Sequence, residues 1–367
     1  MRLFVDITAH GWGHLAQTAP IIEALRSRVP DLECVVRSGV PETLLRNKLG
    51  PLAAFHPSDT DFGVVMESPF AVDCTATLER YRALHTNFER RVEEVAGLIR
   101  REHCDIVLSN VGYLALAAAK QADVPAVACS SLEWGGMVRF YCAGLPGAEA
   151  IAAEIDAAYA GADRFVQLLP SMAIDRWPTI AVERAIARLG TSRRPALVEQ
   201  SGARSNDVIV LCVFGGMLPD SPPMQLLRTP GIVVVGPDAW RAEGVVPLSA
   251  VDLPYEDVLA SVDVVVTKPG YGTIAELGCL GTPSVMVSRG NWPEEEAHVD
   301  WLARHAAVER RPMLDAVTPA DLCRLAARPR TLPLARAGGE ADVADIVLDV
   351  ALKPPALQPS PLHEREA

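Results

Sequence analysis

The stretch that decides the fold is Val265-Val266-Thr267-Lys268-Pro269-Gly270-Tyr271-Gly272-Thr273-Ile274-Ala275-Glu276. Its apolar, β-branched start predicts a buried strand, and the glycines that follow predict a turn. The remainder is typical of a helix that begins directly after the turn. Such a helix directs unpaired backbone N–H groups toward the turn, where they attract anions. The stretch therefore predicts one unit of a parallel α/β sheet with a diphosphate site at its edge.

Two polar side chains of this predicted helix lie one turn apart on the same face. Thr273 can contact a phosphate there, and the Glu276 carboxylate can accept two hydrogen bonds from a ribose diol. The alternative is a capping box, because T-x-x-E is also the pattern in which the threonine caps the helix and the glutamate bonds back to its N–H. The residues predicted to bind a nucleoside diphosphate here are Gly270, Tyr271, Gly272, Thr273 and Glu276.

Two further segments follow predicted strands of the same half of the chain. Gly215 and Gly216 form a flexible turn that can cover the diphosphate from its other side. The segment Arg289–His298 opens a helix, so Glu295 and Glu296 can bind the hydroxyl groups of a sugar. The alternative is an acidic first turn that only stabilises the helix dipole.

Both halves of the chain alternate short apolar runs with helical patterns, as parallel α/β sheets do. Strands are predicted in the first half at Arg2–Thr8, Glu33–Arg37, Asp105–Ser109, Ala126–Ser130 and Arg164–Leu168, and in the second half at Val208–Phe214, Gly231–Val235, Val262–Thr267 and Ser284–Val287. The fold class is therefore α/β, with two Rossmann-like parallel-sheet domains that face a cleft.

A chain of 367 residues favours two domains over a single core. A segment rich in Pro, Ser, Arg and Gly marks the crossing between them. The predicted organisation is an N-terminal domain at 1–175, a linker at 176–206, a C-terminal nucleotide-binding domain at 207–352 and a disordered tail at 353–367. We also predict one long helix over Ala76–Arg101 and a short one over Val182–Leu189.

The run Thr8–His14 lies between the first strand and the first helix, where a parallel sheet binds ligands. Gly11 and Gly13 let a phosphate or a sugar approach the backbone, and they do not complete the dinucleotide pattern G-x-G-x-x-G. His14, in the first turn of the helix, can act as a general base on an acceptor hydroxyl, and the alternative is a capping histidine. His10 either contacts the ligand or supports the loop.

The bulk composition excludes several classes of partner. A formal net charge of −12 argues against a general nucleic-acid or anionic-membrane binder, although peripheral membrane contact stays open. The eight scattered cysteines indicate reduced, buried side chains, and no signal peptide or membrane span is expected. We expect a cytoplasmic protein without cofactor or metal. Asp59-Thr60-Asp61 has the D-x-D form of a divalent-cation motif, but it lies in an irregular segment.

With these motifs the chain resembles the glycosyltransferase-B fold and its MurG-like glycosyltransferases, and more closely the glycosyltransferase-like N-terminal region of L-arabinokinases. The residues that carry the resemblance are Thr8–His14, Leu78–Tyr81, Asp105–Asn110, Lys268–Glu276 and Arg289–Glu295. The resemblance implies that the glycine loop of the first domain faces the acceptor and the pyrophosphate. It also implies that Gly270, Gly272, Thr273 and Glu276 hold a nucleotide donor, and that no metal is required.

The chain departs from both relatives. MurG-like enzymes have a Gln-containing segment where this chain has Glu294–Glu296, and no segment of the arabinokinase kinase domain is expected after Leu352. The leading hypothesis is transfer of a sugar from a nucleoside-diphosphate donor, such as a UDP-sugar, to an unknown hydroxyl acceptor. The alternatives are a nucleotide-sugar hydrolase or epimerase, and a non-catalytic protein that binds nucleotide sugars.

Overall fold

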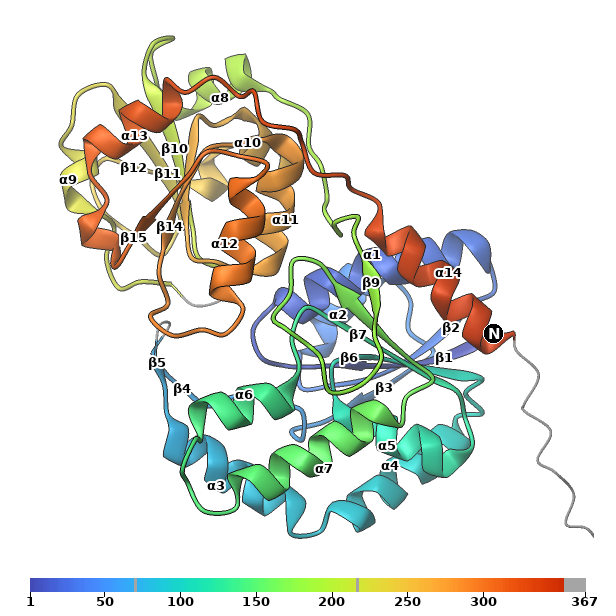
Figure 1. Ribbon diagram of the computed structural model, residues 1–367. Coiled ribbons are helices and arrows are strands. Elements are labelled where there is room, and N and C mark those ends of the chain that lie inside the picture. The colour runs from blue at the N-terminus through green and yellow to red at the C-terminus, as the bar shows by residue number, and fades with distance from the viewer. Residues whose placement is uncertain (69–70, 216–217, 353–367) are drawn as a thin grey trace, which may run out of the picture.

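The computed structural model describes residues 1–68, 71–215 and 218–352 and contains two parallel sheets (Figure 1). The first has the order β3-β2-β1-β6-β7-β8-β9, and the second has the order β12-β11-β10-β13-β14-β15. The strands of the first sheet are β1 (Arg2–Ile7), β2 (Glu33–Ser38), β3 (Ala54–Pro57), β6 (Ile106–Asn110), β7 (Ala126–Ser130), β8 (Arg164–Leu168) and β9 (Ile180–Val182). The strands of the second are β10 (Val208–Val213), β11 (Ile232–Gly236), β12 (Val245–Pro247), β13 (Val264–Thr267), β14 (Ser284–Val287) and β15 (Val308–Arg311). A short antiparallel pair, β4 (Met66–Ser68) and β5 (Ala71–Val72), lies apart from both sheets.

Helices cover both sheets, so the central strands are buried along their whole length rather than on one face only. Every residue of β6, β7, β13 and β14 is buried. The helices are α1 (Gly13–Arg28), α2 (Glu42–Leu49), α3 (Cys74–His85), α4 (Phe88–Arg101), α5 (Tyr113–Ala122), α6 (Trp134–Tyr141), α7 (Ala148–Ala160), α8 (Arg194–Ser201), α9 (Met224–Leu227), α10 (Tyr255–Ser261), α11 (Tyr271–Leu280), α12 (Glu295–Ala303), α13 (Pro319–Ala326) and α14 (Gly339–Ala351), with 3₁₀ turns at Leu248–Ala250 and Leu314–Ala316. The predicted fold class of two parallel-sheet domains is confirmed.

The strand order reverses once in each sheet. β1 pairs with both β2 and β6, so the loops after β1 and β6 diverge at this point, and β10 pairs with both β11 and β13 in the same way. A parallel sheet opens a ligand site where its strand order reverses. The loop after β1 and the loops after β10 and β13, which the sequence singles out, therefore lie at the two switch points.

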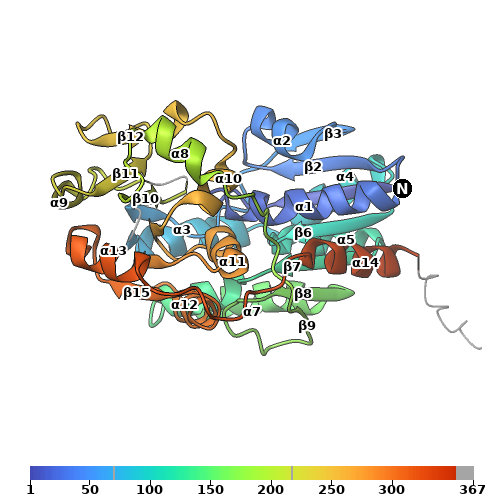
Figure 2. The ribbon, with the colours of Figure 1, turned by 90° about the horizontal axis from the view of Figure 1, so that it is seen from above.

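The chain crosses between the lobes twice, and the two crossing segments pair with each other. Ala185 forms a parallel bridge with Ala337, and its carbonyl accepts the N–H groups of Gly338 at 3.1 Å and Gly339 at 3.2 Å. The second crossing brings α14 back beside α1 (Figures 1 and 2). We call residues 1–182 with 339–351 the first lobe and residues 194–326 the second lobe.

This arrangement corrects the predicted domain ends. The last helix of the expected C-terminal domain at 207–352 belongs to the first lobe, because the buried face of α14, including Val343 and Val347, packs there. The expected linker at 176–206 also begins too early, because β9 is the edge strand of the first sheet. The predicted tail at 353–367 lies outside the described residues.

Two helix predictions are wrong. The single helix expected over Ala76–Arg101 is interrupted at Asn87, whose backbone is not helical, and Thr86 turns its hydroxyl back to the carbonyl of Arg82 at 2.8 Å. The helix expected over Val182–Leu189 does not form, because its backbone groups pair elsewhere. The N–H of Ala185, for example, donates to the carbonyl of Arg336 at 2.7 Å.

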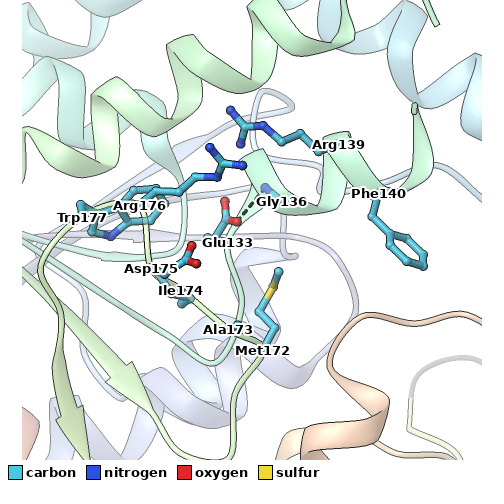
Figure 3. A pocket seen from close by; sticks show the side chains of 10 residues that line it. All are labelled: Glu133, Gly136, Arg139, Phe140, Met172, Ala173, Ile174, Asp175, Arg176 and Trp177. Carbon is cyan, nitrogen blue, oxygen red and sulfur yellow. Dashed lines mark hydrogen bonds between the residues drawn. The ribbon is translucent and has the colours of Figure 1, made fainter. Parts of the chain in front are cut away.

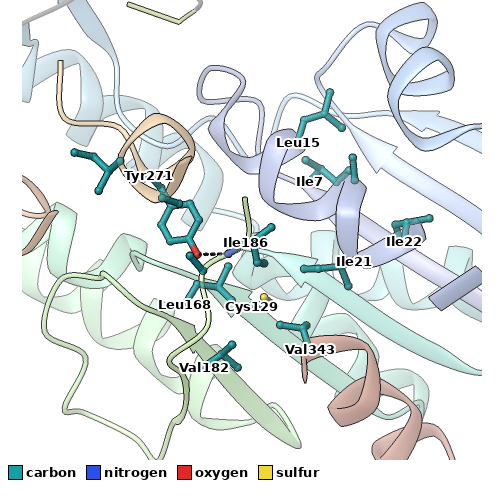
Figure 4. Packing of buried hydrophobic residues seen from close by; sticks show 14 of the residues in the cluster. Ile7, Leu15, Ile21, Ile22, Cys129, Leu168, Val182, Ile186, Tyr271 and Val343 are labelled. Atoms are coloured by element: carbon teal, nitrogen blue, oxygen red, sulfur yellow. Dashed lines mark hydrogen bonds between the residues drawn. The ribbon is translucent and has the colours of Figure 1, made fainter. Parts of the chain in front are cut away.

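The two lobes share part of one hydrophobic core. Tyr271, from the second lobe, packs in the same cluster as Leu168, Cys129 and Val343 of the first (Figure 4). All eight cysteines are free, but Cys323 is exposed and Cys74 half-buried, so the expectation that all are buried is wrong. Within the described ranges, no helix is both long and apolar enough to cross a membrane.

Candidate functional site

The loop after β1 places His14 at the switch point of the first sheet. His14 is 6% exposed, and its Nδ1 lies 2.7 Å from Oδ1 of Asn110, at the end of β6. The amide nitrogen of Asn110 donates to Gln17 Oε1 at 3.0 Å, which orients the Asn110 oxygen toward the histidine. An amide oxygen only accepts hydrogen bonds, so Nδ1 carries the proton and Nε2 keeps its lone pair.

The surroundings of His14 keep it neutral. Burial lowers its pKa, and the hydrogen bond to Asn110 and the charge of Glu294 oppose this effect only in part. Nε2 makes no hydrogen bond to any residue that the structure describes. A neutral imidazole with a free Nε2 lone pair can accept a proton from a hydroxyl group.

His10 joins the first lobe to the second. Its ring stacks on Trp292 with 5.7 Å between centroids and 7° between planes, and it meets the edge of Trp134 at 5.7 Å. Burial lowers its pKa to about 3, with further contributions from His14 and from the cations Arg289 and Lys268. His10 is therefore a neutral packing surface, as the alternative reading of the loop expected.

The loop between β14 and α12 reaches into the first lobe. Trp292 is 6% exposed and belongs to the hydrophobic core of the first lobe. The hydroxyl of Tyr141 donates to the carbonyl of Asn291 at 3.1 Å. Inside the loop, the backbone N–H of Arg289 donates to Glu295 Oε2 at 2.8 Å, which holds the loop closed.

Two cations of the second lobe face the same place without a carboxylate partner. The guanidinium of Arg289 lies 3.5 Å from the ring centroid of Trp292 and is 8% exposed, and its Nε has no hydrogen-bond partner. Burial lowers the pKa of Arg289, and burial and the charge of Arg289 lower the pKa of Lys268 to about 8. Neither side chain forms an ion pair or hydrogen bond with a described residue. Arg289 is buried and Lys268 half-buried, and the nearby negative charges of Glu294 and Glu295 form no ion pair with either cation, so this pair can bind an anion.

Glu294 is the buried carboxylate of this loop. Burial raises its pKa, but His298, the Trp292 N–H and Ser131 outweigh burial and bring the pKa to about 2. Its Oε2 accepts from Trp292 Nε1 at 2.9 Å, and its Oε1 lies 3.4 Å from His298 Nε2. Glu294 therefore stays ionised and holds the indole of Trp292 in place.

The helix α11 begins as the sequence predicts. Gly270 is its N-cap and no side chain caps it, so the first N–H groups are free and the alternative capping box of Thr273 with Glu276 is not formed. A Cβ at Gly13, Gly270 or Gly272 would meet no described atom within 4 Å, and none of the three has a positive φ. Neither packing against described residues nor backbone conformation therefore requires these glycines, and each leaves room for a ligand at the N-terminus of its helix.

Glu276 lies on α11 without a hydrogen bond or ion pair to a described residue. Burial and the nearby Glu256 raise its pKa to about 8, and Arg188 lowers it only slightly. Its carboxyl is therefore protonated at neutral pH, so it can both donate to and accept from a diol. Thr273 contacts the hydroxyl of Tyr255 on α10.

The other residues predicted to bind the donor do not all lie where a donor could reach them. Tyr271 points into the core between the lobes, where its hydroxyl accepts the N–H of Ile186 at 3.3 Å, so its predicted contact with the donor is wrong (Figure 4). Glu296 accepts a hydrogen bond on the surface from Arg310, with 2.6 Å between Nη1 and Oε1, and Glu295 accepts the backbone N–H of Arg289 inside its own loop. Gly215 has a φ of +67° with open space around it, and Gly216 lies outside the described residues.

Gly11 and the D-x-D motif are the last of the sequence features considered for this site. Gly11 needs its glycine backbone, with a φ of +72°. Asp59 is exposed, whereas Asp61 is buried and accepts a hydrogen bond from Thr8, so the two carboxylates do not act together. Among the described residues, no three His, Cys, Asp or Glu side chains are grouped to hold a metal ion.

Sequence reasoning missed four residues that the structure brings to this site, namely Asn110, Lys268, Arg289 and Glu294. All four stood inside segments that were already recognised, but the choice among neighbouring polar residues favoured Glu295 and Glu296. Asn110 could have been found from its place at the end of the strand that pairs with β1.

No family model matches the sequence. L-arabinokinase of Arabidopsis thaliana is 24% identical over 307 residues, which are 79% of this chain and 28% of that protein. An uncharacterized glycosyltransferase of Methanopyrus kandleri is 26% identical over 273 residues, which are 68% of this chain and 74% of that protein. The chain thus spans little more than a quarter of the arabinokinase that it matches.

Solved structures match almost the whole chain. The glycotransferase of kitacinnamycin superposes with a TM-score of 0.63 at 17% identity and covers 95% of this chain and 98% of its own. Medicago truncatula UGT71G1 complexed with UDP-glucose gives 0.58 at 11% identity over 95% and 98%. Acinetobacter baumannii MurG gives 0.54 at 12% identity over 95% and 99%. The fold is the glycosyltransferase-B fold, as the resemblance of the motifs implied.

The tautomer of His14 can be tested directly. In ¹⁵N NMR spectra of the histidine ring at neutral pH, we expect a protonated Nδ1, an unprotonated Nε2 and a pKa below the ordinary value of about 6.5. Asn110→Ala removes the acceptor of the Nδ1 proton and should mix the two tautomers. Asn87→Ala, an exposed asparagine between α3 and α4, should leave them unchanged. An imidazolium at neutral pH would contradict the assignment.

Proposed function

We propose that this protein transfers a glycosyl group from a nucleoside-diphosphate sugar, such as a UDP-sugar, to a hydroxyl acceptor. The observation that carries the proposal is the pair of unpartnered cations, Lys268 and Arg289, at the switch point where the N-terminus of α11 is also free. Positive charge that no described side chain pairs directly suits a diphosphate. The general fold and the relatives that carry glycosyltransferase names support the same reading.

The proposed donor site lies on the second lobe. The diphosphate would lie against the N–H groups of Gly272 and Thr273, with Lys268 and Arg289 neutralising its charge. The protonated carboxyl of Glu276 would bind the ribose diol further along the same helix. In this proposal the leaving group needs no divalent cation, because two side-chain charges and a helix N-terminus stabilise it.

The proposed chemistry uses His14 from the first lobe. As the acceptor oxygen bonds to the anomeric carbon, the bond from that carbon to the diphosphate breaks, and His14 Nε2 takes the hydroxyl proton. The products are a glycoside and a nucleoside diphosphate, and the imidazolium then returns its proton to solvent. Asn110 is a positioning residue, since it holds the tautomer that leaves Nε2 free.

Lys268 should control donor binding in a pH-dependent way. Lys268→Ala is expected to weaken UDP binding about tenfold in calorimetry, because a charge-assisted hydrogen bond is lost. The pKa of about 8 means that wild-type affinity falls between about pH 7 and pH 9, as the ammonium group loses its proton. Lys268→Arg keeps the charge and should lose the part of this pH dependence that Lys268 causes, so that only the part from Glu276, whose pKa is also about 8, remains. An unchanged pH profile in Lys268→Arg would exclude Lys268 as its source.

Substitution of Gly272 should change the stability of the protein and its affinity for UDP in opposite directions. Gly272→Ala adds a methyl group that meets no described atom, so it should raise the free energy of unfolding by up to about 1 kcal/mol through helix propensity. The same methyl group should weaken UDP binding at least about tenfold, because it takes the space of a phosphate. Gly278→Ala on the same helix is the matched control, since its methyl group would clash with Trp301 and lower stability. Unchanged UDP affinity in Gly272→Ala would move the diphosphate elsewhere.

Replacement of the base distinguishes the proposed reactions. With a panel of UDP-, dTDP- and GDP-sugars and a set of hydroxyl acceptors, His14→Gln should reduce turnover about 10² to 10⁴-fold while UDP affinity changes less than about twofold. Turnover should persist in EDTA. Free sugar formed without acceptor would favour the hydrolase, and tight donor binding without turnover would favour the non-catalytic alternative. Full activity of His14→Gln would remove its role as base.

A further inference from the structure

A cavity of about 340 Å³ lies in the first lobe (Figure 3), and neither Lys268 nor Arg289 lines it. The N-terminal part of α6 and the segment that follows β8 form its wall. It is lined by Glu133, Gly136, Arg139, Phe140, Met172, Ala173, Ile174, Asp175, Arg176 and Trp177. The Glu133 carboxyl lies near the middle of these side chains, with Phe140 and Trp177 on opposite sides of it (Figure 3).

Glu133 presents an unused acceptor to this cavity. It is 3% exposed, and its Oε1 caps α6 by accepting the N–H of Gly136 at 2.7 Å. Its other oxygen, Oε2, is buried and forms no hydrogen bond of good geometry with a described residue, although the N–H of Gly135 also lowers the pKa of this carboxyl. A buried carboxylate oxygen without a partner is costly, because it has lost water and gained nothing in return. A ligand that donates a hydrogen bond would remove this cost.

Trp177 presents an unused donor to the same cavity. Its side chain is 6% exposed, and its Nε1–H is buried without a partner within the described part of the chain. An indole N–H in a protein interior normally finds an acceptor. The cavity is therefore lined by one unpaired acceptor, Glu133 Oε2, and one unpaired donor, Trp177 Nε1–H. A hydroxyl group can pair with either, because it both donates and accepts hydrogen bonds.

The charges around the cavity exclude an ionic ligand. Arg139 is already paired with Asp156 at 2.7 Å and Glu149 at 3.0 Å, and Arg176 lies 3.8 Å from Asp156. These cations are therefore not available to an anion, unlike Arg289 and Lys268. They also oppose a ligand cation beside Glu133, whose pKa burial raises to about 7, so that its carboxyl is ionised only in part at neutral pH.

We propose that this cavity binds an uncharged, hydroxyl-bearing ring. One hydroxyl donates to Glu133 Oε2 and another accepts from Trp177 Nε1, while the apolar faces of the ring pack against Phe140, Met172 and Ile174. A volume of about 340 Å³ is at the lower end of small-molecule sites and suits a ligand of one or two rings.

The same helix connects this cavity to the candidate site. Trp134, the first residue of α6, contacts the rings of His10 and His14, and Tyr141, the last, bonds to the loop of Trp292. The cavity is lined by the other face of α6, which carries Gly136, Arg139 and Phe140, so a ligand in the cavity and the ring of His14 lie on opposite sides of one short helix. We therefore do not assign this ligand as the acceptor, and its binding does not rest on the proposed function.

The test uses the full chain with ¹⁵N-labelled tryptophan and three probes that share one scaffold. These are phenyl β-D-glucopyranoside, its glucuronide and its 2-amino-2-deoxy analogue, which are neutral, anionic and cationic. Trp177→Phe assigns the Trp177 indole signal. We expect saturable downfield movement of that signal with the neutral probe at millimolar concentration, and binding of both charged probes at least about fivefold weaker.

Two variants locate the probe. Glu133→Gln retains an oxygen for the cap but turns the second group into a donor, so affinity for the neutral probe should fall about tenfold. Asp175→Asn changes an exposed carboxylate on the rim of the same cavity and should alter affinity less than about twofold. Met172→Trp fills the cavity while leaving Glu133 itself unchanged and should abolish binding, which keeps the test valid if Glu133→Gln folds poorly.

Several outcomes would overturn the proposal. They are an unmoved Trp177 signal with all three probes, tighter binding of a charged probe than of the neutral one, or equal affinity in Met172→Trp. UDP binding is measured in parallel on the same samples. Probe binding without UDP binding would support the cavity as a binding site and refute the proposed function. UDP binding without probe binding would support the proposed function and refute the cavity as a binding site.

Discussion

The insertion of Trp292 from the second lobe into the core of the first is the interaction on which the site depends. Its ring stacks on His10, lies under the guanidinium of Arg289, and is held by a hydrogen bond to Glu294. An aromatic side chain buried across an interface stabilises it and restricts the angle at which the two lobes meet. The ring of Trp292 therefore brings the glycine loop of the first lobe next to the loop of the second lobe that carries Arg289.

The two lobes divide the charges between them. The second lobe brings Lys268 and Arg289, which form no ion pair with a described residue, together with a helix N-terminus that no described side chain caps, and so favours an anion. Facing it, the first lobe brings His14 in a neutral form, and a separate cavity in which the arginines are already paired. Positive charge placed only on one side suits a donor that leaves as a diphosphate and an acceptor that is neutral.

The glycines show how far a motif can be interpreted from the sequence. Gly270 and Gly272 were predicted to make room for a ligand, and a Cβ at either position would meet no described atom within 4 Å. Tyr271 between them was grouped with the same site, but it points into the core, because successive residues of a helix face different directions. Thr273 and Glu276 could not be separated from a capping box until the helix start at Gly270 was known.

The sequence by itself determined the two parallel sheets, the loops at their switch points and the candidate roles of His14 and the helix after Gly270, because hydrophobic periodicity and glycine turns are local signals. Only the tertiary structure decided which polar side chains meet. Asn110 reaches His14 from 96 residues away, Glu294 rather than Glu295 or Glu296 is buried beside Trp292, and α14 returns to the first lobe. Each of these depends on contacts between distant segments, and burial and pairing, which set charge and tautomer, are properties of those contacts.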